Sequence, residues 1–259
     1  MLRMMKTEIR KLKRYHILWA GGLLMLLSVL LTVFSTTAMD DTVWTFSFFA
    51  EQVIKSNVTT IFPMCIALIA GYIISREAKD DTLKNIMTVP VSYCNLLWGK
   101  LIVCGLLSLL LGLVSAVFTV TASLLLGFPG FSAAAISQTF ILIILNCLFL
   151  YIAVLPVSAI AARIPNGHMI GAIIAFVYGY GGMFASANAT MANIYPVTAS
   201  LGLVSYRSYD PSVHWNRFIC FFSLLTALLI TAAFVFTTKG SAPVKTTKKE
   251  AKSVTKKGW

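Results

Sequence analysis

The side chains that could carry out catalysis are few in this sequence and are not spaced for it. The three histidines, His16, His168 and His214, lie far apart, and no HExxH pattern is present. The five cysteines include no CxxC pair, so a metal site or disulfide framework has no support from spacing. The sequence therefore predicts no metal site and no catalytic centre. We interpret the cysteines as small buried hydrophobic residues.

A phosphate-binding loop is also missing from the sequence. The pattern GxxxxGK[ST] surrounds the phosphates of a nucleotide with backbone N–H groups. The pair Gly99-Lys100 has neither the upstream glycine nor the following hydroxyl residue that this pattern requires. We therefore expect that the chain is not an enzyme and that it binds no cofactor itself.

The composition indicates a protein that is dissolved in lipid. Hydrophobic residues make up 58% of the 259 residues, compared with about 45–50% in soluble domains. Charged residues make up only 12%, about half the usual share, and the mean hydropathy is +0.83. The net charge of +12 does not indicate a nucleic-acid partner, because the basic residues are confined to a few segments. These features favour an integral membrane protein.

Apolar windows without charged residues predict six transmembrane helices. A span needs about 20 residues, so the uncharged run from Leu101 to Ala162 must contain two, separated around Gly127, Pro129 and Gly130. The expected spans are residues 17–35, 58–75, 101–126, 138–161, 168–187 and 218–237. We expect an all-α integral membrane fold, in which residues 1–238 form a single transmembrane domain and residues 239–259 form a disordered basic tail.

The distribution of basic residues predicts the orientation. Residues 188–217 could hold a seventh span, but that would place the seven tail lysines outside. Six spans put eighteen Lys and Arg residues on one side, and only Lys55, Arg207 and Arg217 on the other. Because basic residues concentrate in cytoplasmic loops, we expect both termini in the cytoplasm and residues 188–217 outside, as a short helical hairpin.

Two cytoplasmic segments have the pattern of amphipathic helices. In residues 1–16, Met5, Ile9 and Leu12 form an apolar stripe among basic residues, which is typical of a helix lying on anionic lipid. This helix is either a topology anchor or a functional lever. The second segment is the loop Arg76–Lys100, which carries a short helix that begins near Asp81 or Thr82 and ends before Pro90. It either lies on the membrane as a connection or docks into a groove of a partner.

These segments resemble the type-2 ABC exporter permeases, most closely those of lantibiotic-immunity and bacitracin-resistance transporters. The run Glu8-Ile-Arg-Lys-Leu-Lys-Arg14 is similar to the family's basic elbow helix. The loop follows the family pattern "E…G-T-L-K…P-x-S-R…G-K", with Asp81 in place of its glycine and Tyr93 in place of its basic residue. Asn193-Ile-Tyr195-Pro196 is similar to the family's outer segment before the last span.

The resemblance implies that the loop contains a coupling helix, which fits a groove of an ATPase subunit. Leu83, Ile86 and Met87 would form its apolar face. The coupling residues that it implies are Glu77, Asp80, Asp81, Thr82, Leu83, Lys84, Ile86, Met87 and Pro90.

The partners that the resemblance implies are two copies of an ABC ATPase, which bind ATP and Mg²⁺, and a second permease subunit, identical or a sister. Membrane lipid is a further expected partner, and nucleic acid is not expected. The implied location is a bacterial plasma membrane, and the implied substrate is an antimicrobial peptide of the lantibiotic or bacitracin type.

The alternative is a stand-alone membrane transporter or a membrane hydrolase without an ATPase partner. These proteins use charged or paired acidic groups within their spans, and the expected spans here contain none.

Two further patterns concern packing and the outer surface. Gly171, Ala175 and Gly179 predict a small-residue face for close helix packing. The outer segment concentrates aromatic residues, which favour the level of the lipid headgroups. They either anchor the segment or form a ligand site or outer gate, for which the candidate residues are Tyr195, Pro196, Tyr206 and Trp215. Asn57-Val-Thr and Asn188-Ala-Thr match the glycosylation pattern. We disregard both matches, because the family that the chain resembles is bacterial.

Overall fold

The computed structural model describes residues 2–12, 15–37, 44–79, 93–161, 164, 167–207 and 214–237. All regular secondary structure within these ranges is helical. Six of the helical segments are long and apolar enough to cross a membrane. The fold is therefore that of an all-α integral membrane protein, as the sequence predicts.

The helices follow one another as a series of spans with short accessory helices at the ends. Their bounds are α1 Leu2–Leu12, α2 Ile17–Thr37, α3 Phe46–Ser56, η1 Asn57–Ile61, α4 Phe62–Lys79, α6 Tyr93–Leu126, α7 Ala133–Ala161, α8 Gly167–Ala185, α9 Ala189–Ile194, α10 Pro196–Leu203 and α11 Arg217–Thr237. The segment η1 is a π-helical turn that joins α3 and α4 into one helical run.

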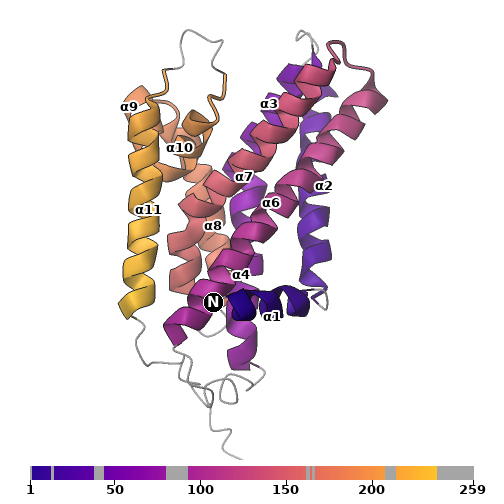
Figure 1. The fold of residues 1–259 in the computed structure, drawn as a ribbon. Coiled ribbons are helices and arrows are strands. Elements are labelled where there is room, and N and C mark those ends of the chain that lie inside the picture. The colour runs from indigo at the N-terminus through magenta and orange to yellow at the C-terminus, as the bar shows by residue number, and fades with distance from the viewer. Residues whose placement is uncertain are drawn as a thin grey trace, which may run out of the picture.

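The spans form an upright bundle, which helix α1 crosses at its lower end (Figure 1). We call this end, where α4, α7 and α11 finish, the inner end of the bundle. The opposite end, which holds the α6–α7 turn and helices α9 and α10, is the outer end (Figure 1). Six spans place α1 and the last residue of α11 at the same end, and α9 and α10 form the short helical pair expected within residues 188–217.

Three helices extend beyond the spans expected from charge-free windows. The helix of the second span starts at Phe46 and includes Glu51 and Lys55, whereas the expected span starts at residue 58. The third starts at Tyr93 and contains Lys100, and the fourth starts at Ala133. Charge-free windows mark the apolar part of a span, but a helix continues through charged positions when their long side chains find a polar contact.

The expected break between the third and fourth spans lies where α6 and α7 turn. Gly127 has φ 69° and Gly130 has φ 96°, both in the left-handed region that glycine tolerates best. Phe46 N donates a hydrogen bond to Pro129 O at 3.0 Å, so the turn is tied to the start of α3.

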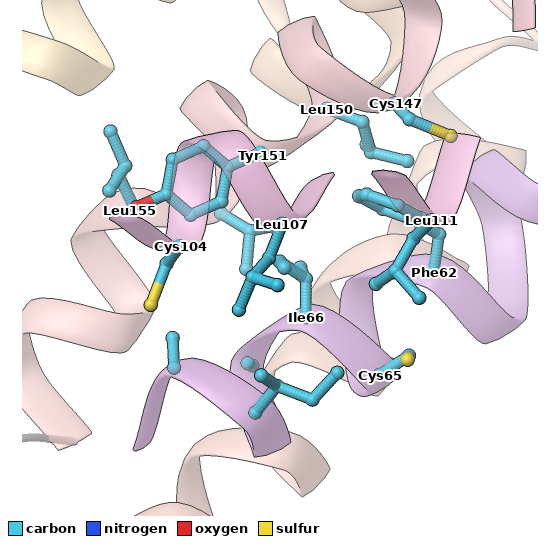
Figure 2. Close-up of a cluster of buried hydrophobic side chains, with 14 of the residues drawn as sticks. Phe62, Cys65, Ile66, Cys104, Leu107, Leu111, Cys147, Leu150, Tyr151 and Leu155 are labelled. Atoms are coloured by element: carbon cyan, nitrogen blue, oxygen red, sulfur yellow. The ribbon is translucent and has the colours of Figure 1, made fainter. Parts of the chain in front are cut away.

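The core lies where α4, α6 and α7 meet. Figure 2 shows Ile66 from α4, Leu107 from α6 and Leu150 from α7 within one buried cluster. Cys65, Cys104 and Cys147 belong to the same cluster as free thiols, which confirms their interpretation as buried residues. The Tyr151 hydroxyl in this cluster donates to Leu101 O and satisfies its polar group.

Small residues allow α8 to pack closely on its neighbours. A Cβ atom at Gly179 would lie 2.8 Å from Pro63 Cγ in α4, and one at Gly171 would lie 2.6 Å from Ala161 Cβ. Ala175, between them, is fully buried. The expected small-residue face is therefore present and brings the helix backbones together.

Candidate functional site

The residues expected to form the coupling helix lie outside the described part of the chain. Helix α4 is described to Lys79, and the description resumes at Tyr93 in α6. The Glu77 side chain and residues 80–92 therefore have no described contacts. Their coupling role stays a prediction, and the structure shows only the helices that hold the two ends of the loop.

The two helices that flank this loop are joined by a buried lysine. Lys100 in α6 is 2% exposed, and its Nζ donates a hydrogen bond to Ile73 O of α4 at 2.9 Å. A buried ammonium group is costly unless polar atoms surround it, so this contact fixes α4 and α6 against each other. The sequence predicts a helix that starts after Ser92 and runs into the third span, and Lys100 stands in the second turn of that helix, α6.

The inner end also holds a cluster of aromatic rings around an arginine. The Arg76 guanidinium carbon lies 4.4 Å from the centre of the Tyr15 ring, and Nη1 donates to the Tyr72 hydroxyl at 3.1 Å. The ring of His168, at the start of α8, meets the Tyr72 ring edge-on at 6.5 Å. The cluster links the segment after α1 to α4 and α8 through cation–π and ring contacts.

Helix α1 packs against the bundle through one face. Leu12 and Glu8 are buried on that face, while Ile9 and Arg10 are exposed. The Glu8 carboxylate pairs with Lys11 Nζ at 2.7 Å, which satisfies the buried acid. The elbow helix is therefore attached to the inner end of the spans rather than lying apart from them.

A buried asparagine organises the outer end. Asn193, which is 6% exposed, donates from Nδ2 to Ala189 O at 2.7 Å and to His214 O at 3.2 Å. Its Oδ1 accepts from Asn216 N at 2.8 Å and from Cys220 Sγ at 3.2 Å. One side chain thus ties α9 to the segment that leads into α11, and the sequence did not single it out for that role.

The four outer residues expected from the sequence fall into two neighbouring groups. Tyr195 packs on Tyr178 of α8 with ring centres 5.0 Å apart, and its hydroxyl donates to Tyr178 O at 2.6 Å. Burial raises the pKa of the Tyr195 phenol to about 12, so it remains a donor at physiological pH. Pro196 occupies the first turn of α10, where its missing N–H is not needed.

Tyr206 and Trp215 form the second group and line a cavity at the outer end. Trp215 Nε1 donates to Tyr206 O at 2.7 Å, which holds the two ends of the segment together. The cavity has a volume of about 390 Å³. Its walls come from α3, η1, α8, α9, α10 and the segment before α11, through residues Lys55, Val58, Thr59, Gly182, Met183, Ser186, Ala187, Ala189, Ala192, Thr198, Leu201, Tyr206, Arg207, His214 and Trp215.

A polar cluster that the sequence analysis missed lies inside the bundle. Ser28, Asn57 and Ser115 are fully buried and come from α2, η1 and α6. Ser28 Oγ donates to Asn57 Oδ1 at 2.6 Å, and Asn57 Nδ2 donates to Ser115 Oγ at 3.0 Å. The sequence feature that could have indicated this cluster is a polar residue, Asn57, directly before an expected span. The sequence analysis considers Asn57 only as a glycosylation match.

The π-helical turn η1 begins at this asparagine. π-helical turns are rare and occur frequently at functional sites. Here the turn lies between α3, which borders the outer cavity, and α4, which leads to the inner end. Among the described residues, no cluster of three or more His, Cys, Asp or Glu residues could hold a metal ion.

Comparison with known proteins gives two matches. The model of a family described as ABC-2 family transporter protein matches residues 4–182, which run from α1 through most of α8. The bacitracin transport permease protein BCRB of Bacillus licheniformis is 27% identical over 121 residues. That match covers 46% of this chain and 58% of the relative, so the chain spans a little over half the length of the curated relative.

Proposed function

This chain belongs to the ABC-2 transporter family, and from that premise we propose that it is the permease subunit of an ATP-driven exporter. The observation that carries the proposal is the family match over residues 4–182, on a chain with six helices suited to cross a membrane. ATP and Mg²⁺ would bind in separate ATPase subunits. The sequence supports that division of labour, because it contains no Walker pattern.

The proposed complex contains two ATPase subunits and two permease subunits, the second permease being identical to this chain or a sister. The loop between α4 and α6 would enter a groove of the ATPase. Two observations at the ends of the loop support this role. Lys100 joins α6 to α4, and Arg76 joins α4 to the ring of Tyr15. A push on the loop would therefore move both helices and the elbow helix as one unit.

The proposed orientation places the inner end in the cytoplasm of a bacterial cell, together with both termini. It is supported by the eighteen Lys and Arg residues of the segments assigned to that side. The cavity and the aromatic residues of the outer segment would then face the outside, where a peptide antibiotic arrives.

The proposed substrate is an antimicrobial peptide of the bacitracin or lantibiotic type, moved or expelled for resistance or self-protection. Support comes from the named transport role of the 27% identical relative and from Tyr195 and Trp215 in the outer segment. A stand-alone transporter or membrane hydrolase is the competing function, but the charged residues between the first and last residues of the candidate spans, Glu51, Lys55 and Lys100, lie in the first ten residues of their spans rather than at mid-span.

The test is to express the chain in a sensitive bacterium with and without a candidate ABC ATPase. Growth in bacitracin should require both proteins, and bacitracin should stimulate ATP hydrolysis by the purified complex. Alanine at Tyr195 and Trp215 should reduce the stimulation while leaving the complex assembled. Resistance from this chain alone would support the stand-alone alternative, and unchanged stimulation would make the aromatic residues an anchor.

A further inference from the structure

The outer cavity gathers most of the positive charge of its side of the membrane. Only three Lys and Arg residues fall on the side opposite the basic termini. Two of them, Lys55 and Arg207, line the cavity, and His214 lines it as well. The third, Arg217, donates to Ser205 Oγ at 2.7 Å, two positions from Arg207. Among the residues that the structure describes, no aspartate or glutamate lines the cavity, and Glu51 lies one helical turn before Lys55 on α3.

The position of Lys55 makes this concentration of charge informative. Lys55 stands within the second candidate span, two residues before the buried Asn57. A cation within a span is costly unless it faces a polar cavity or a partner of opposite charge, and such residues mark binding sites and pathways. The cavity wall therefore gives the Lys55 side chain polar surroundings near the outer end of this span.

Arg207 is positioned by an unusual backbone. Ser205 and Arg207 have φ values of 54° and 49°, in the left-handed region that residues other than glycine seldom occupy. Such conformations persist only where the surrounding structure enforces them, and they cluster at binding sites. Trp215 and Arg217 hold this turn through their bonds to Tyr206 O and Ser205 Oγ.

The remaining polar groups of the cavity leave charge as its main means of recognition. The hydroxyls of Thr59, Ser186 and Thr198 donate to the backbone carbonyls of Lys55, Met183 and Tyr195, respectively. The Trp215 indole N–H donates to Tyr206 O. A ligand would therefore meet the two basic side chains together with those of Tyr206 and His214, and an anion with several oxygens would match the basic side chains best.

The apolar surroundings indicate where such an anion comes from. Met183 lines the cavity and is 45% exposed, and Phe184 and Val177 on the same helix α8 are still more exposed. An acyl chain can lie along this surface while its headgroup enters the cavity, which at about 390 Å³ falls in the range of small-ligand sites. We propose that the cavity binds the phosphate of an anionic lipid headgroup through Lys55 and Arg207.

The experiment uses the full chain in bilayer discs of phosphatidylcholine mixed with phosphatidylglycerol. A photoreactive p-benzoylphenylalanine replaces Met183 in one sample and Phe184 in a matched control, because Phe184 is exposed but does not line the cavity. Illumination and mass spectrometry then identify the lipid attached at each position. Phosphatidylglycerol should be captured at position 183 in excess of its share of the bilayer, and at position 184 in proportion to it.

Charge-neutralising variants identify the source of the preference. Lys55→Gln should lower the excess of phosphatidylglycerol captured at position 183 about fivefold, because each basic side chain near an anionic leaflet contributes about a fivefold preference for anionic lipid. Lys55→Gln combined with Arg207→Gln should abolish the excess. Lys55→Arg should retain it. Lys55→Gln alone serves as the test if the double variant does not fold, since the Lys55 side chain is exposed.

Several outcomes would overturn the proposal. Equal capture at positions 183 and 184, or an excess that Lys55→Gln leaves undiminished, would exclude a headgroup site. Complete displacement of the lipid by inorganic phosphate would assign the cavity to a free anion. Selective capture of added bacitracin in place of lipid would assign it to the peptide. The readout requires neither ATPase nor transport, so it fails or succeeds independently of the proposed function.

Discussion

The two ends of the bundle are held together by different chemistry. At the inner end, charged side chains make the connections, as Lys100 does between α6 and α4 and Arg76 does on the Tyr15 ring. At the outer end the connections are mostly neutral, with Asn193 bonded to four partners and Trp215 bonded to Tyr206. Lys55 and Arg207 differ from these neutral contacts, because they are charged and line the cavity of the outer end.

Under the proposed function, the inner end would transmit movement from the ATPase and the outer end would receive the ligand. A charged contact between helix ends is strong where water is partly excluded, and it keeps the helices moving as a unit. A neutral network holds a fixed shape without adding charge to the outer side, where basic residues are few. The comparison predicts that changes at the inner end uncouple the protein, whereas changes at the outer end alter its stability or its ligand.

The largest expected effect is the loss of the ATPase from an inner-end variant. Ile86→Asp places a charge on the expected apolar face of the coupling helix, where it would be buried without a partner. We expect the chain to insert and fold, but to lose the ATPase completely during affinity purification. Lys84→Ala is the matched control, because an exposed charge contributes about 0–1 kcal/mol. Full ATPase stoichiometry and activity with Ile86→Asp would show that the loop is not the coupling element.

A smaller, purely structural effect is expected at the outer end. Asn193→Ala removes four hydrogen bonds at a buried position and should lower the free energy of unfolding by roughly 2–3 kcal/mol. The measurement is denaturation in detergent, with ATPase binding followed in parallel and expected to persist. Asn188→Ala, which removes the cap of the short helix α9, should cost only about 1 kcal/mol. Equal effects of the two variants would show that Asn193 does not organise this end.

The smallest effect is expected midway between the ends. Asn57→Leu removes the bonds to Ser28 and Ser115, and hydrogen bonds between membrane helices contribute about 0.6 kcal/mol each on average. We expect a loss of roughly 1 kcal/mol in the same denaturation assay. Thr121→Val, which removes only bonds from an exposed side chain to its own helix α6, should change stability by less than about 0.5 kcal/mol. A larger loss of ATPase stimulation than of stability would give the π-helical turn a role in coupling.

Features that depend on local sequence were predicted well. Charge-free apolar windows located six spanning helices, and Gly127 and Gly130 marked the turn between α6 and α7 because both adopt positive φ. The small-residue face of α8 followed from spacing, since residues about one helical turn apart share a face.

Features that depend on helices meeting in space were not predicted. Ser28, Asn57 and Ser115 stand in separate helices, and no pattern within any one of these helices shows that the three side chains meet. Lys55 and Arg207 were counted only as outer charges, because no pattern along the chain shows that they share a cavity. Tyr206 and Trp215 were selected as aromatic residues, but the bond between them depends on the fold of the outer segment.

The proposed function requires the inner end of this chain to engage an ATPase, and photocrosslinking can capture that contact. A p-benzoylphenylalanine placed at position 86 of the full complex should capture the ATPase subunit, as a single larger species that contains both chains. The same group at Phe128, in the turn between α6 and α7 at the outer end, should capture none. Capture from position 128, or no capture from position 86 in a complex that hydrolyses ATP, would show that the ATPase does not engage the inner end as proposed.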